Sequence, residues 1–368
     1  MTGAVGTQPA GLDDRVRDAV EETLRAYLDR RALEAAAIDP AFGEAARALA
    51  EFVTGGKRVR PVFAWWGWRG AGGDPDGPDA PAVLTAVSAL ELVQACALVH
   101  DDLMDDSATR RGAPTVHVRF AARHAGAGWT GRAERFGAAA AILLGDLALA
   151  WADDMLRSSG LPAPAAARAS VPWEAMRTEV LGGQYLDVLH QAAADTTAAG
   201  AQRVNRFKTA AYTVERPLHL GAAVAGAEDA LITAYRRFGA DVGIAFQLRD
   251  DLLGVFGDPS VTGKPAGDDL REGKRTFLLA LGMQRAEERR DATARAELES
   301  AVGDPGLDDA AVDRVRSLLV ELGAVAAVEE RIAELTGTGL LALEGAGIAE
   351  PAATRLAELA VAATRRQR

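Results

Sequence analysis

Apolar residues recur along this chain at the spacing of helices, and the alternating pattern of β-strands is nearly absent. The long segments are filled with Ala, Leu, Arg and Glu, which favour helices. The pattern predicts an all-α chain, with helices over Asp13 to Ala37, Pro81 to Asp106, Phe136 to Leu156, Leu231 to Phe256 and Ala310 to Leu335.

Three stretches rich in Gly, Pro or Ser interrupt this pattern and predict loops: Gly70 to Pro81, Gly126 to Gly131 and Ser158 to Pro172. None of them is long or polar enough to be a convincing linker between domains. We therefore expect residues 13–368 to form a single-domain bundle of about ten or more helices. The Gly/Ala/Thr-rich residues 1–12 are expected to be a disordered lead-in.

Two short acidic clusters stand out because each of them closes an apolar helical stretch. The first, Val99 to Asp106, reads VHDDLMDD, and the second, Phe246 to Gly254, reads FQLRDDLLG. Aspartate is a poor helix former and a costly ion to bury unless something neutralises it. The clusters therefore predict two facing helices whose carboxylates bind cations.

A solvent-exposed helix end is the alternative interpretation of each cluster, because runs of charge are usually solvated. The sequence before the first cluster disfavours that interpretation, since residues Ala82 to Val99 contain only one charged residue, Glu91. A helix that is apolar all round is buried, so its aspartates would emerge into a cavity.

Asp101 and Asp105 stand four residues apart and share one helix face, where both carboxylates can hold one ion or a pair of ions. Mg²⁺ fits this donor set, because it prefers oxygen ligands and often binds through one or two carboxylates plus substrate phosphates. Zinc is the weaker alternative, since apart from His100 the histidines show no ligand spacing.

The composition limits the classes of protein and of binding partner that need to be considered. A chain of 368 residues, 49% of them hydrophobic, can bury a large core. The net charge of -11 opposes binding to nucleic acid or an anionic membrane through overall charge. Cys96 is the only cysteine, which excludes an internal disulfide and a thiolate metal cage and fits a cytoplasmic protein. No uncharged apolar run approaches the roughly 18–20 residues that span a bilayer, so stable membrane insertion is not expected.

Local groups of basic residues provide candidate phosphate sites. Lys57, Arg58 and Arg60 follow two glycines, and Arg110 and Arg111 follow the first acidic cluster. Arg offers a planar fork for phosphate oxygens, and Lys offers a compact charge. Each group is a weak signal alone, and a Walker-type nucleotide site is excluded because no Gly-x-x-x-x-Gly-Lys-Ser/Thr follows a strand.

Together these motifs resemble those of the trans-isoprenyl diphosphate synthases, the polyprenyl synthetase family. They run in the family's order: GGKRVRP at 55–61, DDLMD at 101–105, RRG at 110–112, GQYLD at 183–187, KT at 208–209 and FQLRDD at 246–251. The resemblance implies the isoprenoid synthase fold, in which helices surround a central active-site cavity. It also implies a prenyltransferase that joins isopentenyl diphosphate to an allylic diphosphate.

The resemblance assigns roles to individual residues. The acceptor, isopentenyl diphosphate, is expected to bind Lys57, Arg60, Gln94 and Arg111. The allylic diphosphate is expected to bind Arg110, Lys208, Lys264 and Lys274. Two Mg²⁺ are expected on Asp101 and Asp105 and a third on Asp250, with Asp102 and Asp251 assisting. Thr209 and Gln247 are expected to face the allylic carbon as charge develops.

In the implied mechanism the metal ions stabilise the diphosphate as it leaves, the acceptor double bond attacks the resulting cation, and a proton is lost. Helices lined with Ala, Leu and Val would keep water away from the cation. No His or Glu is clearly placed as a base, so the departing diphosphate is expected to take the proton.

One position departs from the family pattern. The second cluster ends in Gly254, where family members often carry a third aspartate. We expect activity to survive, because the resemblance assigns the third ion mainly to Asp250. Asp258 or the pair Asp268 and Asp269 can supply a nearby charge. A weakly active or regulatory subunit is the alternative that this departure leaves open.

Product length in this family depends on the helix that carries the first acidic cluster. The fourth and fifth positions before that cluster are Ala97 and Cys96, and Val93 lies about one turn deeper. These small residues disfavour a floor at fifteen carbons, and geranylgeranyl diphosphate, a product of about twenty carbons, is the preferred expectation. Farnesyl and longer polyprenyl products stay open, because the opposite wall is not identified from sequence.

Two other functions share part of these motifs. A class I terpene cyclase would carry the aspartates but needs no acceptor site, and a non-catalytic partner subunit would make no product alone. The expected partners are isopentenyl diphosphate and the dimethylallyl, geranyl and farnesyl diphosphates. The family also implies a homodimer, and no nucleic acid is expected to bind.

Overall fold

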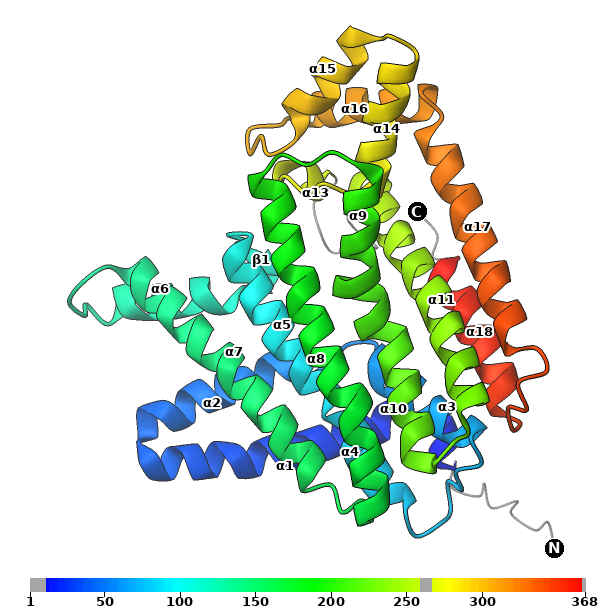
Figure 1. Cartoon of the computed structure of the whole chain (residues 1–368). Coiled ribbons are helices and arrows are strands. Elements are labelled where there is room, and N and C mark those ends of the chain that lie inside the picture. The colour runs from blue at the N-terminus through cyan, green and yellow to red at the C-terminus, as the bar shows by residue number, and fades with distance from the viewer. Residues whose placement is uncertain (1–10, 259–266, 366–368) are drawn as a thin grey trace, which may run out of the picture.

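The computed structural model describes residues 11–258 and 267–365, and it confirms the all-α prediction. Helices account for most of these residues, and one hairpin joins two short strands (Figure 1). In chain order the elements are η1 (Leu12–Asp14), α1 (Val16–Ile38), α2 (Pro40–Val53), α3 (Val59–Gly70), α4 (Ala80–Ser88), α5 (Leu90–Met104), β1 (Thr109–Arg110), β2 (Ala113–Pro114), α6 (Val116–Gly126), α7 (Ala133–Arg157), α8 (Ala163–Ala192), α9 (Ala198–Val204), η2 (Asn205–Glu215), α10 (Arg216–Ala225), α11 (Asp229–Phe256), α13 (Asp268–Arg271), α14 (Phe277–Glu288), α15 (Ala292–Ala301), α16 (Asp309–Glu321), α17 (Ala324–Leu343) and α18 (Ala352–Thr364).

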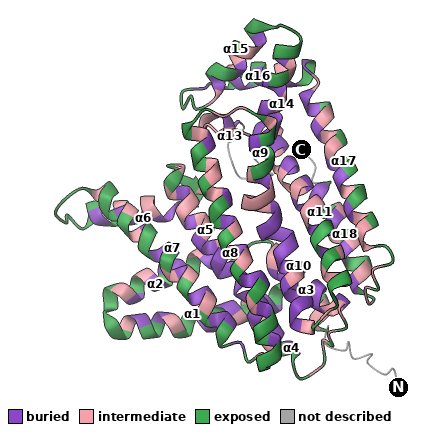
Figure 2. Ribbon diagram, in the orientation of Figure 1, coloured by how far each residue is buried: buried purple, intermediate pink, exposed green. Residues whose placement is uncertain are grey.

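The helices that carry the sequence motifs are neighbours in space. α5 packs on α7, α8 packs on η2, and η2 packs on α11 (Figure 1). Buried residues are concentrated on the central helices, and exposed residues cover the outer faces of the peripheral ones (Figure 2). The first acidic cluster on α5 and the second on α11 are thus brought to opposite sides of the same interior.

Buried apolar side chains of the described residues form two clusters. The larger includes Trp65 of α3 and Phe238 of α11, and the smaller joins the second half of α11 to α14–α17. Val242 belongs to the larger cluster and Ala245 to the smaller, so the single helix α11 supports both. The interpretation of residues 13–368 as one domain stays a prediction.

Two predicted helices are interrupted in the structure. The helix expected over Pro81 to Asp106 breaks at Ala89 into α4 and α5. Ser88 Oγ donates to the Leu84 carbonyl at 2.7 Å, and such bonds often bend helices. The helix expected over Ala310 to Leu335 is α16 followed by α17, because Gly323 adopts φ 76°, a left-handed conformation that ends the first helix.

The prediction of a loop over Ser158 to Pro172 is wrong for the residues after Pro162. α8 begins at Ala163 and continues for 30 residues, with Pro172 buried inside it. Residues 1–10 of the predicted lead-in lie outside the described residues, and Leu12 begins the short helix η1.

Two apolar helical stretches reach the length and composition of a membrane span, Ala80–Met104 and Ala133–Arg157. Uncharged apolar runs stay shorter than that length, as expected, because isolated charges such as Glu91 interrupt them, but the helices continue through these charges. The most apolar window of the first is 67% buried, which is typical of a core helix. The corresponding window of the second, α7, is only 39% buried, so much of its apolar surface faces outward.

Candidate active site

A cavity of about 210 Å³ lies among α5, α8, η2 and α11, and both acidic clusters contribute to its wall. The predicted site residues that line it are Arg60, Val93, Gln94, Cys96, Ala97, Asp101, Lys208, Thr209, Gln247 and Asp250. The remaining predicted residues that the structure describes lie outside this lining, and most of them contact it through partners given below.

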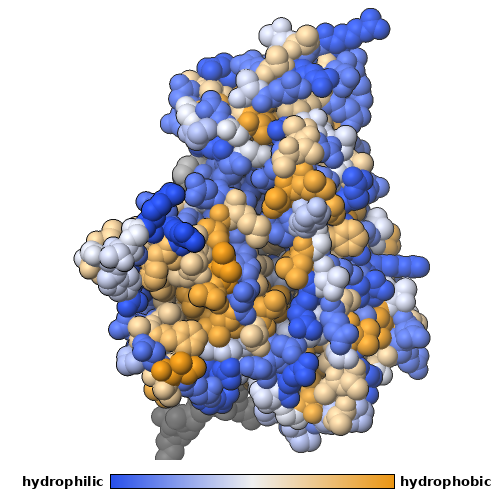
Figure 3. Space-filling view, turned by 60° about the vertical axis from the view of Figure 1, so that its left-hand side comes forward, coloured by the Kyte–Doolittle hydropathy of each residue, from blue (hydrophilic) through white to orange (hydrophobic). Residues whose placement is uncertain are grey.

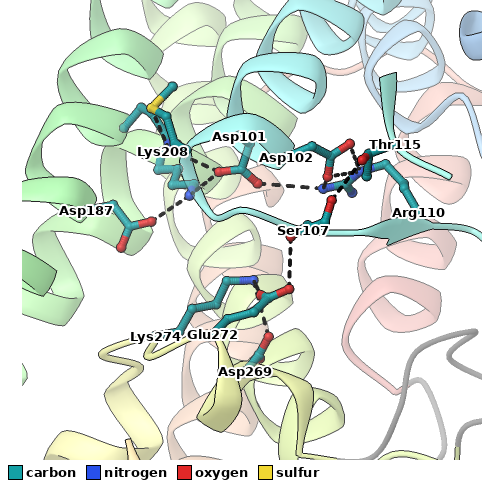
Figure 4. Close-up of polar contacts among 12 residues, drawn as sticks. Asp101, Asp102, Ser107, Arg110, Thr115, Asp187, Lys208, Asp269, Glu272 and Lys274 are labelled. Carbon is teal, nitrogen blue, oxygen red and sulfur yellow. Dashed lines mark hydrogen bonds and ion pairs between the residues drawn. The ribbon is translucent and has the colours of Figure 1, made fainter. Parts of the chain in front are cut away.

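Asp101, in the last turn of α5, lies at the centre of a network of polar contacts (Figure 4). Lys208 Nζ donates to Asp101 Oδ1 at 2.9 Å and to Asp187 Oδ2 at 2.6 Å, and Gln184 Nε2 donates to Asp101 at 3.1 Å. Burial alone would raise the pKa of Asp101, but the charge and hydrogen bond of Lys208 bring that pKa below its usual range. Asp101 is therefore held ionised.

Asp102 points away from Asp101 and binds Arg110 (Figure 4). Arg110 Nε donates to both Asp102 oxygens, at 2.7 and 2.9 Å, and the carboxylate is almost completely buried. The hairpin β1–β2 presents Arg110, since Arg111 and Gly112 at its tip have positive φ angles of 53° and 75°. The hairpin thus anchors the paired arginines beside the first acidic cluster.

Asp105 caps the end of α5, and nearby cations balance its negative charge less well than that of Asp101. Burial, followed by the charge of Asp101, raises the pKa of Asp105 to about 6. The C-terminal end of a helix carries partial negative charge, which further favours a cation at this place. Two close carboxylates at a helix C-terminus are a suitable donor set for Mg²⁺.

Carboxylates of the two acidic clusters are the candidate metal ligands. Within residues 11–258 and 267–365, no three His, Cys, Asp or Glu side chains converge in a way that could hold an ion. The candidate carboxylates are Asp101 and Asp105 at the end of α5, and Asp250 of α11, which lines the same cavity as Asp101. Lys208 occupies the position of a counter-charge at Asp101.

Lys274 lies near Asp105, and its charge opposes the rise in the pKa of Asp105. Its Nζ contacts Glu272 at 2.6 Å and Asp269 at 3.3 Å, and Ser107 donates to Glu272 at 3.1 Å (Figure 4). These contacts tie the segment after α13 to the end of the first acidic cluster. Lys264, the other lysine predicted to bind the allylic diphosphate, lies outside the described residues.

The absence of a side chain at Gly254 has a structural reason that the sequence did not reveal. A Cβ atom at this position would overlap Oδ2 of Asp269, so the absence of a side chain lets that carboxylate approach α11. Asp269 therefore lies where the missing third residue of the second cluster would project. Of the alternatives that we considered from sequence, the structure favours Asp269 as the nearby charge.

The second cluster continues as a chain of hydrogen bonds. Thr209 Oγ1 donates to Gln247 Oε1 at 2.6 Å, and Gln247 Nε2 donates to Asp251 Oδ1 at 2.7 Å. Asp251 is buried, whereas Asp250 lines the cavity. The two adjacent aspartates therefore differ in environment: Asp250 faces the cavity, and Asp251 orients Gln247.

The helix η2 has the wide turn of a π-helix, which is rare and frequent at functional sites. Four of its residues line the cavity: Lys208, Thr209, Tyr212 and Thr213. A Cβ atom at Gly183 of α8 would overlap the backbone of Lys208, so this glycine allows the two helices to approach closely. The close approach brings Lys208 to Asp101.

The residues predicted to bind the acceptor form a second group. The Arg60 guanidinium lies 4.0 Å from the Tyr212 ring centroid and donates to Thr213 Oγ1 at 3.0 Å, while Gln94 accepts a hydrogen bond from Tyr212. Gly56 contacts the Arg111 side chain closely enough that an added Cβ would lie 3.3 Å from its Nη2. The structure thus brings the motif that contains Lys57 beside the paired arginines.

Arg58, the remaining cation of that motif, has a structural role. It is buried, and its Nη1 lies 2.6 Å from Glu91, the one charged residue of the apolar stretch before the first acidic cluster. It also pairs with Glu21 of α1. Removing one partner of a buried ion pair typically costs about 3–5 kcal/mol, so Arg58 fixes the basic motif against α5.

Three contributors to the site had no assigned role from sequence: Gln184, Asp187 and Tyr212. The first two belong to the GQYLD motif, whose position beside KT on the neighbouring helix becomes visible only in three dimensions. Tyr212 lies four residues after Lys208 in η2, the spacing of side chains that share a helix face, so the KT motif could have pointed to it.

Comparison with known proteins agrees with these motifs. A sequence profile of the family described as polyprenyl synthetase matches residues 43–318. The chain is 35% identical over 280 residues to a geranylgeranyl diphosphate synthase of Mycobacterium tuberculosis, covering 76% of this chain and 72% of the relative. It is also 35% identical over 280 residues to a geranylfarnesyl diphosphate synthase of Aeropyrum pernix, covering 75% and 79%.

A solved structure is similar over nearly the whole chain. It is the geranylgeranyl pyrophosphate synthase of Corynebacterium glutamicum in complex with isoprenyl diphosphate and magnesium. The sequence identity is 47% and the TM-score 0.92, with 96% of this chain and 99% of that chain covered.

The contact between Gly254 and Asp269 predicts the effect of Gly254→Ala. The new methyl group would push the Asp269 carboxylate away from Lys274, whereas alanine itself favours a helix over glycine by about 0.5–1 kcal/mol. We expect activity to fall about ten- to a hundredfold with no loss of thermal stability. In steady-state assays Asp269→Ala should have the same effect, and the double variant should be no worse than either. Additive losses would contradict the contact.

The buried Asp251 predicts a pH dependence of stability. Burial raises its pKa to about 7, with Asp269 and Asp250 adding to the increase and a hydrogen bond from Gln247 opposing it. The folded protein therefore keeps a proton, between about pH 4 and pH 7, that the unfolded chain loses, so the free energy of unfolding falls as pH rises. We expect Asp251→Asn to reduce this fall in urea titrations with chelator near pH 5 and pH 8. An unchanged fall would assign it to another group.

Proposed function

The chain belongs to the polyprenyl synthetase family, and we propose that it joins isopentenyl diphosphate to an allylic diphosphate, with geranylgeranyl diphosphate as its main product. Members of this family are trans-prenyltransferases, and this chain is one. The observation that supports the proposal best is the single cavity that both acidic clusters share with Arg60 and Gln94. A cyclase would need the acidic clusters but no second group of diphosphate ligands.

We assign the allylic diphosphate to the acidic side of the cavity. Asp101, Asp105 and Asp250 would hold Mg²⁺, with three ions as the proposed number, and Lys208, Lys274 and Arg110 would contact diphosphate oxygens directly. When bound, the metal ions would neutralise the charge of the diphosphate and stabilise it as a leaving group. The magnesium and isoprenyl diphosphate bound to the similar Corynebacterium enzyme support this assignment.

Side chains of this protein prepare the site for the developing allylic cation. Thr209 and Gln247 are linked at 2.6 Å and present oxygen atoms to the cavity, where they can stabilise positive charge on carbon. The wall between α5 and α8 is formed by apolar residues, including Ala97, Leu98 and Val180, which exclude water. The reaction needs no carboxylate side chain as a base, since the released diphosphate can accept the proton.

We assign the acceptor diphosphate to Lys57, Arg60 and Arg111, beside Gln94. The Arg111 side chain is exposed at the hairpin tip, and its partial desolvation together with the charge of Arg110 lowers its pKa. A further anion is the partner that such an arrangement of arginines favours. The acceptor would then lie next to the allylic carbon, with Tyr212 positioning both Arg60 and Gln94.

We also propose that the protein is a homodimer. Large apolar side chains are exposed on α7 and α8, among them Leu143 at 67%, Leu181 at 55% and Tyr185 at 67%. Figure 3 shows apolar residues gathered in the middle of the face that it turns toward the viewer. A second copy can cover such a face. Light scattering should give twice the chain mass for the wild type and the chain mass for Leu143→Asp/Leu181→Asp, and a monomeric wild type would refute the proposal.

Product analysis tests the proposed activity. Purified protein is incubated with isopentenyl diphosphate and each of the five-, ten- and fifteen-carbon allylic diphosphates, with Mg²⁺ or with chelator, and the products are sized. We expect a main product of twenty carbons that requires Mg²⁺. Lys57→Ala should cripple this condensation, whereas it would spare a cyclase. Absence of condensation with every starter would show that the activity is wrong.

The α5 wall predicts shorter products from larger side chains. Cys96 and Ala97 both line the cavity, and a phenylalanine at either place would fill the space one turn below Asp101. We expect Cys96→Phe and Ala97→Phe to shift the main product to fifteen carbons or fewer, measured by the same product sizing. Unchanged product lengths in both variants would show that this wall does not limit the chain.

A further inference from the structure

A charged side chain, Arg177, lines the apolar part of the cavity. Three helices line that part: α5 with Ala97 and Val93, α7 with Leu149, and α8 with Val180 and Arg177. Arg177 is the one charged residue among these five lining side chains, and Gln94, next to Val93 on α5, is a polar neighbour in the same lining.

The helix geometry places Arg177 two turns below the reacting end. Gln184, which contacts Asp101, lies seven residues after Arg177 on α8, which corresponds to about 10 Å. On α5, Val93 lies eight residues before Asp101, or about 12 Å. Arg177 and Val93 therefore lie at similar depth, and both of them line the cavity.

Two side chains, one from α7 and one from α8, hold Arg177 in place. Its Nη1 donates to Asp153 Oδ1 of α7 at 3.0 Å, and its guanidinium lies 5.6 Å from the ring centroid of Trp173. Trp173 Nε1 donates to the same Asp153 oxygen at 3.1 Å. The guanidinium is thus fixed between α7 and α8, at the end of the space that an apolar chain would enter.

We propose that Arg177, fixed by Asp153, ends the elongation channel and sets the product length, an inference that rests on the proposed function. A prenyl chain that grows past this level must either displace the ion pair or bury the guanidinium against hydrocarbon. Both cost free energy, because a charged group loses water without gaining a new partner. Small residues on α5 set how wide the channel is, and Arg177 on α8 sets where it ends.

The test compares three substitutions at position 177 in the full-length protein. Arg177→Ala removes bulk and charge, Arg177→Met removes the charge but keeps an extended side chain, and Arg177→Lys keeps a cation within reach of Asp153. We expect Ala and Met to raise the share of products longer than the wild-type product about tenfold, because charge desolvation no longer opposes entry. Lys should keep the wild-type length.

Arg157→Ala is the matched control. Arg157 Nε also contacts Asp153, at 2.6 Å, but its side chain is 78% exposed and does not line the cavity, so its loss should leave product length unchanged. Wild-type product lengths in both Ala and Met at position 177 would overturn the inference while leaving the proposed function intact. A wild-type protein that condenses no substrate would overturn both.

Discussion

The ion pair between Lys208 and Asp101 is the contact on which the arrangement of the site depends. It connects η2 to α5 at 2.9 Å, and through Asp187 it also connects η2 to α8 at 2.6 Å. All three side chains are largely withdrawn from solvent, so none of them is stable as an isolated charge. The pair holds the first acidic cluster ionised and aimed into the cavity, in the form that binds a cation.

The other charges of the motifs divide into those that build the site and those that face it. Arg58 and Glu91 neutralise each other inside the protein, and Asp102 is buried against Arg110 of the hairpin, which we also assign to the diphosphate. Asp105, Asp250 and Lys274 remain at the cavity or next to it. The -11 net charge therefore says little about diphosphate binding, which depends on where individual ions are paired.

Much of the site could be predicted from sequence, because residue spacing along one helix determines which side chains share a face. Asp101 and Asp105, four residues apart at the end of α5, are such a pair. Contacts between distant segments could not be predicted in this way. The sequence offers Asp258, Asp268 and Asp269 as charges near Gly254, but a glycine gives no signal of which distant atom fills the space beside it.

The channel shows the same limit of sequence reasoning. Cys96, Ala97 and Val93 follow from counting back along α5, whereas Arg177 reaches the channel from α8, inside a segment that was partly expected to be a loop. Its Ala- and Pro-rich beginning obscured the helical pattern, and Pro172 is accommodated within the helix.

The central claim is that the two acidic clusters form one site in which metal and diphosphate bind together. Calorimetric titration of the wild-type protein with inorganic diphosphate, in the presence of Mg²⁺ and in chelator, tests it most directly. We predict binding about 100-fold tighter with Mg²⁺, since each ligand neutralises the charge that opposes the other. Equal affinity for diphosphate in chelator would contradict a shared site.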